Sequence, residues 1–379
     1  MRARGLGIEF EGTPGPLNTI TDVSGVEVGH TTLISGSGAL RVGQGPIRTG
    51  VTAILPRGKN AITEPVFAGW FAQNGNGEMT GTTWIDESGF LEGPVMITNT
   101  HSVGVVRDAV IAWQIKHNAK FQPWSLPVVA ETYDGYLNDT DGFHVKTEHA
   151  WSALDSAQSG AVTEGNVGGG TGMICFGYKG GIGTASRHLQ SYQGGYTVGV
   201  LVQCNTGGRQ QLRVGGELVG PELAELAPKI ASAAPGAGGS ASERGSIIII
   251  IATDAPLLPH QLKRIARRAT MGLARDGAVS SNGSGDIFLA FSTANAGAAG
   301  GQYSSASSAR PPSRTTTVEM VGNDAITPLL EATVQATEEA IINALIAAED
   351  MRGRDDHFVP ALPHEALRDV LRKHNRLTK

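Results

Sequence analysis

Short apolar runs separated by glycines and polar turns make up much of this chain, and one of them is five consecutive isoleucines at residues 247–251. The run is too short to cross a membrane, and its β-branched side chains favour a strand. Because no polar residue alternates with the isoleucines, we expect a central strand that is covered on both faces. Ser246 is then the first residue of a rigid element.

The remaining apolar pattern predicts a layered fold. Further strands are expected at residues 25–29, 51–55, 94–98, 127–130, 173–176, 196–203 and 287–291. Helices are expected at 102–115, with Ser102 as the N-cap, and at 259–275, 328–349 and 366–371. Apolar sheets with amphipathic helices outside them favour a four-layer αββα sandwich of the α/β (α+β) class.

The glycine-rich segment 165–172 matches neither nucleotide-binding motif, because it has no closing Lys-Ser/Thr pair and no G-x-G-x-x-G spacing. Tight turns before the strand at 173–176 are the favoured interpretation. A backbone nest that binds an anion is the alternative.

The composition limits which classes of binding partner are expected. The 379 residues carry 35 acidic and 30 basic side chains without long blocks, which excludes an extended nucleic-acid footprint or a polybasic membrane patch and favours small-molecule or peptide partners. Cys175 and Cys204 lie in apolar runs, so two buried free thiols are expected. No apolar signal segment follows Met1, which makes the cytoplasm the default location and a periplasmic one, after removal of a leader, the alternative.

The bond between Gly245 and Ser246 joins two unlike segments. Residues 231–245 are rich in Ala, Gly, Ser and Pro and have little to bury, whereas a buried strand follows. Cleavage there would give Ser246 a free α-amine with a reference pKa of about 7.7–8.0, which suits a general base beside its own hydroxyl. A loop that simply enters a strand is the plainer interpretation.

Other kinds of active site fit poorly. The histidines are scattered, there is no paired-cysteine spacing, and neither Ser246 nor Ser284 lies in a G-x-S-x-G elbow. An N-terminal nucleophile remains as the hypothesis, and it requires oxyanion donors and polar residues that hold the amine and the hydroxyl. Taken singly, Asn205 and Asp286 look like turn formers, and Tyr133 like a core aromatic.

Three long sequence motifs favour the functional interpretation of these residues over the structural one. The stretches 20–26 (ITDVSGV), 48–53 (RTGVTA) and 283–295 (GSGDIFLAFSTAN) resemble the L-aminopeptidase/D-esterase (DmpA-type) family of self-processing serine peptidases, which includes the β-aminopeptidases. The resemblance covers nearly the whole chain. It implies one catalytic domain, 1–379, that cuts itself into an α chain, 1–245, and a β chain, 246–379. It also implies an αββα sandwich similar to that of N-terminal-nucleophile hydrolases, with different connectivity.

The resemblance also assigns roles to residues and implies no cofactor and no metal. Ser246 corresponds to the nucleophile and, with Gly245, to the self-cleavage site. Asn205 corresponds to an oxyanion donor that Tyr133 assists, and Ser284 and Asp286 orient the nucleophile and its amine. Glu131 has an independent physical argument as a further site residue, since its carboxylate is suited to pair with a substrate ammonium.

The expected activity is therefore release of N-terminal residues from peptides, amides or esters through an acyl-enzyme on Ser246. The alternatives are an amidohydrolase or acyltransferase of the same fold that acts on pantetheine-like amides, and an inactive binding protein that stays uncut. The sequence leaves open whether the acyl group is L-α-, D-alanyl or β-aminoacyl. The family resemblance implies αβ units that assemble into a tetramer, with no nucleic-acid or membrane partner.

Overall fold

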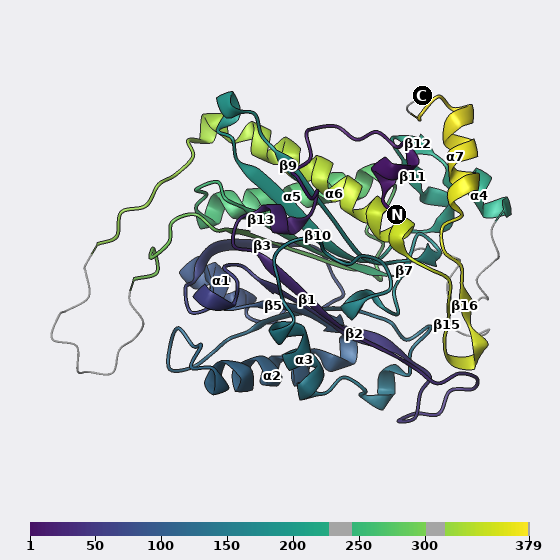
Figure 1. The fold of residues 1–379 in the computed structure, drawn as a ribbon, viewed down its shortest axis with the longest axis horizontal. Helices are drawn as coiled ribbons and strands as arrows, with labels where there is room; N and C mark the ends of the chain where they lie inside the picture. The colour runs from purple at the N-terminus through teal and green to yellow at the C-terminus, as the bar shows by residue number, and fades with distance from the viewer. Residues whose placement is uncertain (227–244, 301–314, 378–379) are drawn as a thin grey trace.

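Two stacked β-sheets with helices on their outer faces form the core of the protein (Figure 1). The computed structural model describes residues 1–226, 245–300 and 315–377. The larger sheet has the order β4 (Phe90–Leu91), β3 (Val66–Gly75), β14 (Gly285–Ser292), β13 (Ser246–Thr253), β10 (Thr197–Asn205) and β9 (Gly181–His188). The smaller sheet has the order β1 (Glu27–Ser35), β2 (Ile47–Leu55), β5 (Val95–Asn99) and β6 (Val128–Thr132).

Helices cover both sheets. The helices α5 (Pro259–Arg275) and α6 (Thr327–Ala347) pack on the larger sheet, and α2 (Val103–Lys116) and α3 (Thr147–Asp155) pack on the smaller one (Figure 1). The remaining elements are α1 (Thr82–Ser88), α4 (Gly220–Leu226), α7 (His364–Lys373) and the short strand pairs β7 (Ile174–Cys175) with β8 (Tyr178–Lys179), β11 (Arg213–Val214) with β12 (Glu217–Leu218), and β15 (Met351–Arg352) with β16 (Phe358–Val359). The predicted αββα sandwich is confirmed.

The isoleucine strand β13 is buried on both faces, as predicted. Ile247, Ile249 and Ile251 belong to the cluster that packs against α5 and α6. Ile248 and Ile250 belong to the cluster between the two sheets. Because side chains alternate along a strand, one uninterrupted apolar run fills two hydrophobic layers at once.

The two strands that pair with β13 bring the ends of three strands together. The strand β13 pairs with β10 in antiparallel and with β14 in parallel orientation. In this register Ser246 lies beside Asn205 on one side and beside Gly285 on the other. The start of β13, the end of β10 and the start of β14 therefore meet at one edge of the larger sheet.

The glycine-rich segment forms a turn, as favoured from the sequence. The amide of Gly168 donates to the Thr32 hydroxyl at 2.9 Å, and that of Gly169 donates to the Thr52 hydroxyl at 3.2 Å. A Cβ on Gly169 would lie 2.1 Å from Oε1 of Gln203. These two amides are used inside the protein, so they are not available to an anion, and glycine is needed for close packing between the sheets.

Two sequence predictions need correction. Ser102 is the N-cap residue of α2, as predicted, but its side chain makes no capping hydrogen bond, because the preceding 3₁₀ turn Thr100–Ser102 holds its backbone near the helical region instead of the extended one. Cys175 and Cys204 are not free thiols but form a disulfide with a Cα–Cα distance of 5.6 Å. The strand β7 lies against the end of β10, where the amide of Phe176 donates to the carbonyl of Thr206 at 2.6 Å, and this brings the two cysteines together.

Two parts of the predicted organisation lie outside the described residues, namely the linker 231–245 except for Gly245, and residues 301–314 of the loop expected after 291. Among the residues that are described, no helix is long and apolar enough to cross a membrane. No group of three or more His, Cys, Asp or Glu side chains in the same ranges is placed to hold a metal ion.

The disulfide leads to a stability prediction. It closes a loop between cysteines 29 residues apart, and cross-links of this kind stabilise a fold by about 2–4 kcal/mol. The double variant Cys175→Ala/Cys204→Ala should lose about that much free energy of unfolding in urea titrations. Reductant should destabilise the wild type and leave the double variant unchanged. Two titratable thiols in unreduced, unfolded wild type would show that the cross-link is absent.

Candidate active site

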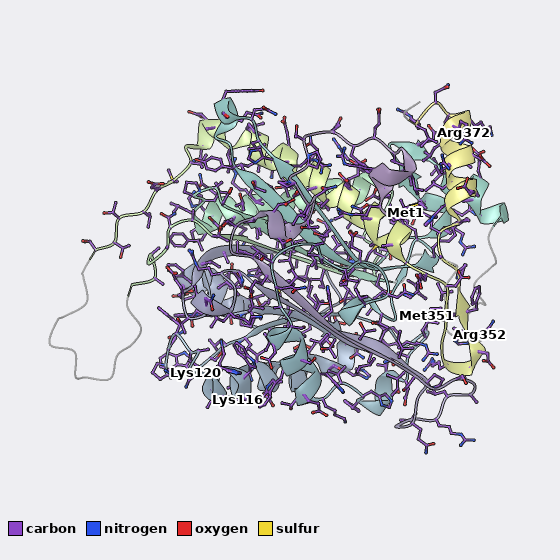
Figure 2. The ribbon with its side chains drawn as sticks, in the orientation of Figure 1. Met1, Lys116, Lys120, Met351, Arg352 and Arg372 are labelled. Atoms are coloured by element: carbon purple, nitrogen blue, oxygen red, sulfur yellow. A yellow bond between two sulfur atoms is a disulfide. The ribbon has the colours of Figure 1, made fainter. Side chains whose placement is uncertain are left out.

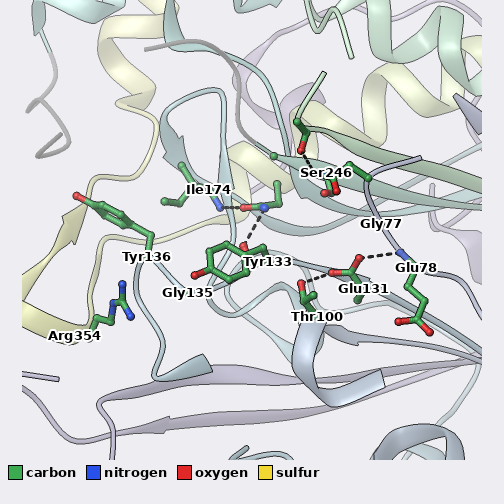
Figure 3. A pocket seen from close by; sticks show the side chains of 14 residues that line it. Gly77, Glu78, Thr100, Glu131, Tyr133, Gly135, Tyr136, Ile174, Ser246 and Arg354 are labelled. Carbon is green, nitrogen blue, oxygen red and sulfur yellow. Dashed lines mark hydrogen bonds between the residues drawn. The ribbon is translucent and has the colours of Figure 1, made fainter. Parts of the chain in front are cut away.

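A cavity of about 630 Å³ opens at the edge where the three strand ends meet (Figure 3). Its walls come from segments far apart in the sequence, including the ends of β6 and β10, the start of β13 and the β15–β16 hairpin. The lining residues are Asn76, Gly77, Glu78, Thr100, Glu131, Tyr133, Gly135, Tyr136, Ile174, Asn205, Gly245, Ser246, Gly283 and Arg354. Five of the predicted site residues, Glu131, Tyr133, Asn205, Gly245 and Ser246, thus line one cavity.

Ser246 lies at the base of this cavity with 7% of its surface exposed. Its Oγ accepts a hydrogen bond from the amide of Gly285 at 3.1 Å, which leaves the hydroxyl hydrogen available to a base. The preceding residue is held close to β10, because a Cβ on Gly245 would lie 1.9 Å from the carbonyl oxygen of Asn205. Only glycine fits immediately before Ser246 in this arrangement.

Asn205 is fixed by two backbone groups. The amide of Ile174 donates to Asn205 Oδ1 at 2.8 Å, and Asn205 Nδ2 donates to the carbonyl of Tyr133 at 3.1 Å. An N–H must face the oxygen and a carbonyl must face the NH₂ group, so these contacts define which way the side-chain amide points. The second hydrogen of Nδ2 remains available for a substrate oxygen in the cavity.

The β7–β8 hairpin supports Asn205 from behind. Its disulfide joins Cys175 to Cys204, the residue before Asn205. The ammonium of Lys179 is fully buried and donates to the carbonyls of Met173 at 2.9 Å and Gly180 at 2.8 Å. Burial without a neighbouring carboxylate lowers the pKa of Lys179 to about 7. The hairpin that presents the Ile174 amide is therefore held by both a covalent and a polar contact.

Ser284 and Asp286 lie behind the nucleophile, not in the cavity wall. Both side chains are fully buried, and the Ser284 hydroxyl donates to Asp286 Oδ1. The same oxygen accepts the amide of Ile247 at 3.2 Å. This pair fixes the backbone one residue after Ser246.

Glu131 supplies buried acidity to the cavity. Its side chain accepts the amide of Glu78 at 3.0 Å and the hydroxyl of Thr100. Burial raises the pKa of Glu131 despite these two hydrogen bonds, and the nearby charges of Glu78 and Asp134 raise it further. A cationic ligand group would stabilise the ionised carboxylate here.

Tyr133 is placed differently from the expectation. Its carbonyl contacts Asn205, but its ring lies over Gly135, where a Cβ would come within 2.2 Å of the Tyr133 hydroxyl. Figure 3 shows the hydroxyl pointing away from Ser246. The predicted contact of this hydroxyl with the reaction centre is not made, although the side chain is 53% exposed and has room to rotate.

Several lining residues were not predicted from the sequence. Thr100 follows the predicted strand at 94–98, and this position at a strand end was a usable signal. Ile174 contributes a backbone amide, which no residue type reveals. Tyr136 and Arg354 come from a turn and from a distant hairpin, so only the fold shows that they share a cavity.

Comparisons with known proteins agree with this geometry. The model of peptidase family S58 matches residues 18–359. A β-peptidyl aminopeptidase (BapA) of Sphingosinicella microcystinivorans is 56% identical over 99% of this chain and 93% of its own length. A β-aminopeptidase structure from a Burkholderia species has a TM-score of 0.87 at 50% identity and covers 98% of this chain and 99% of its own. The L-aminopeptidase D-Ala-esterase/amidase of Ochrobactrum anthropi, described as a variant of the Ntn hydrolase fold, has a TM-score of 0.86 at 45% identity and covers 100% of this chain and 99% of its own.

The buried ammonium behind Asn205 predicts a pH dependence of stability. The pKa of Lys179 falls from 10.5 to about 7 on folding, so between these values the unfolded chain binds the extra proton. Its contribution to stability therefore rises with pH across this window and is lost as the pH falls toward 7. The free energy of unfolding of the wild type, relative to Lys179→Met, should increase from about pH 7 to 10 in urea titrations.

The exposed Lys116 gives a matched control. Lys116→Met, which removes a lysine from the surface, is measured over the same pH range to account for loss of a lysine side chain as such. Parallel stability curves for the wild type and Lys179→Met would show that Lys179 keeps an ordinary pKa when folded.

Proposed function

The chain belongs to peptidase family S58 and is an aminopeptidase, and from this premise we propose that Ser246 is its nucleophile and that the enzyme activates itself by cutting the Gly245-Ser246 bond. One observation supports this most directly. Ser246 is the first residue of a strand buried on both faces, and its side chain faces a cavity that also contains Asn205 and Glu131.

Self-cleavage would proceed as an acyl shift. The Ser246 oxygen attacks the Gly245 carbonyl carbon, an ester C–O bond forms, the peptide C–N bond breaks, and the nitrogen takes up a proton. Water then hydrolyses the ester, which leaves a carboxylate on Gly245 and a free amine and hydroxyl on Ser246. The α chain, 1–245, and the β chain, 246–379, would stay together, because β13 pairs with strands of both parts.

Catalysis would use the same groups on a second carbonyl. The free amine takes the proton of the Ser246 hydroxyl as its oxygen attacks, and it returns a proton to the leaving amine. The free N–H of Asn205 stabilises the oxyanion, and Ser284 with Asp286 holds the start of β13 in position. After rotation of its ring, Tyr133 can add a hydroxyl donor. Water then releases the acyl group.

The relatives favour a class of acyl group. Two of them are described as a β-peptidyl aminopeptidase and a β-aminopeptidase, so we propose that β-aminoacyl peptides are the main substrates. L-α-aminoacyl and D-alanyl amides or esters are further candidates, as in the name of the Ochrobactrum relative. Assembly of the αβ units into a tetramer is proposed on the family resemblance alone.

The location is also a proposal. Disulfides form and persist in oxidising compartments, so the bond between Cys175 and Cys204 favours the periplasmic alternative over the cytoplasmic default.

Ser246→Ala tests self-cleavage. The variant lacks the attacking oxygen, so it should run as one chain of 39.4 kDa on denaturing gels, whereas the wild type gives two fragments. Ser191→Ala, at an exposed serine outside the cavity, should mature like the wild type. Intact mass identifies the cut bond. If Ser246→Ala still gives two fragments, one ending at residue 245 and the other beginning at residue 246, another group performs the cleavage.

Asn205 variants test the oxyanion role in matured enzyme. Asn205→Ala removes the donor and should lower kcat by on the order of 100–1,000-fold with little change in KM. Asn205→Asp keeps an acceptor for the Ile174 amide but has no N–H, so it separates loss of the donor from loss of the support. It should be at least as slow as Asn205→Ala. A near-normal kcat in either variant would remove this assignment.

A further inference from the structure

The cavity has two ends of opposite charge. Glu131 and Glu78 lie on one side and Arg354 with Tyr136 on the other, with Tyr133 between them (Figure 3). Ser246 lies on the acidic side of this division in the same view. Arg354 is the one cationic side chain among the lining residues that the structure describes. The proposed mechanism uses the acidic end and gives no role to the basic one.

Arg354 is held on a rigid support. It follows β15 in a tight turn whose amide at Gly353 donates to the carbonyl of His357 at 2.9 Å. The amide of Arg354 itself donates to the carbonyl of Leu137, also at 2.9 Å. The His357 ring stacks on Tyr136 with ring centres 4.4 Å apart. The turn is therefore fastened to the segment that follows Tyr133, and it carries Arg354 at a defined place in the wall.

The guanidinium of Arg354 is partly buried and makes few contacts with other polar groups. The side chain is 26% exposed, and its Nε is buried without a hydrogen-bond acceptor. Its nearest carboxylate is that of Asp355, which is 45% exposed and 4.0 Å from Nε. No hydrogen bond links this guanidinium to any other described residue. A planar group with five donors thus lines the cavity with one long ion pair, to Asp355, among the described residues.

We infer that Arg354 binds the C-terminal carboxylate of the peptide that leaves, so that the enzyme prefers short peptides with a free C-terminus, dipeptides above all. This rests on the proposed function, in which the substrate ammonium lies at Glu131 and the scissile carbonyl at Ser246. The leaving part then extends toward Arg354, whose fork matches a carboxylate in two parallel hydrogen bonds. A cavity of about 630 Å³ suits a ligand of this size.

Three matched substrates test the inference. They share one N-terminal residue, β-alanyl or L-alanyl, whichever the enzyme releases faster, and carry alanine, alaninamide or p-nitroaniline after the scissile bond. Only the first has a carboxylate. The wild type should favour the free acid over the amide, and Arg354→Gln should reduce that ratio of kcat/KM by about 10–100-fold, mostly through KM. Its rate on the anilide should stay within about twofold of the wild type, since no carboxylate is involved.

Arg352→Gln is the matched control. Arg352 lies on the same hairpin at the outer edge of the molecule, its guanidinium is over the Phe358 ring, and it does not line the cavity (Figure 2). This variant should keep the wild-type ratio. Arg354→Lys should keep part of the preference for the free acid over the amide, because the positive charge remains but the planar guanidinium with its two parallel donors is lost.

The outcomes separate this inference from the proposed function. If the anilide is cleaved but Arg354→Gln leaves the ratio of kcat/KM for the free acid to that for the amide unchanged, Arg354 does not bind the carboxylate. The proposed function then stands. If matured wild type cleaves none of the three substrates, the proposed function itself fails. Should Arg354→Gln not fold, inhibition of wild-type anilide hydrolysis decides, with alanine expected to inhibit at least about tenfold more strongly than alaninamide. Equal inhibition overturns the inference.

Discussion

A strand made of one repeated apolar residue cannot define its own register, and the placement of the active site depends on how this chain solves that problem. Sliding residues 247–251 by one position would turn isoleucines to both faces as before, so burial alone does not distinguish the registers. The polar residues at the strand ends do. Asp286 accepts the amide of Ile247 at one end, and the Thr253 hydroxyl donates to the carbonyl of Thr197 at 2.8 Å at the other.

One of the two contacts that set the register, between Asp286 and Ile247, is thus also a contact of the candidate site. A slip that spared the isoleucines would separate Ser246 from the Gly285 amide and from Asn205. Folding and placement of the nucleophile are therefore one event, and a strand in the wrong register would have no site. Strand pairing also defines the separation of the proposed nucleophile and its oxyanion donor more precisely than two loops would.

The sequence predicts best where burial alone decides the structure. The isoleucine strand and the helix at 259–275 are found as expected, because their patterns are strong and local. The strand β9 was missed, since Thr184, Ser186 and Arg187 look exposed in sequence. They are buried because distant partners satisfy them, as Glu339 does for Arg187 at 2.8 Å. The disulfide, the direction of the Tyr133 ring and the place of Arg354 likewise depend on contacts between remote segments.

The electrostatics of the cavity connect recognition with protonation. A buried carboxylate with a raised pKa, such as that of Glu131, is stabilised in its ionised form when an ammonium binds beside it, so the proposed binding of the substrate amine would be linked to loss of the Glu131 proton. The two ends of a short peptide would be recognised by different side chains. In the proposed arrangement the amino end would be bound by the carboxylate of Glu131, and the carboxyl end by the guanidinium of Arg354 at the other side of the cavity.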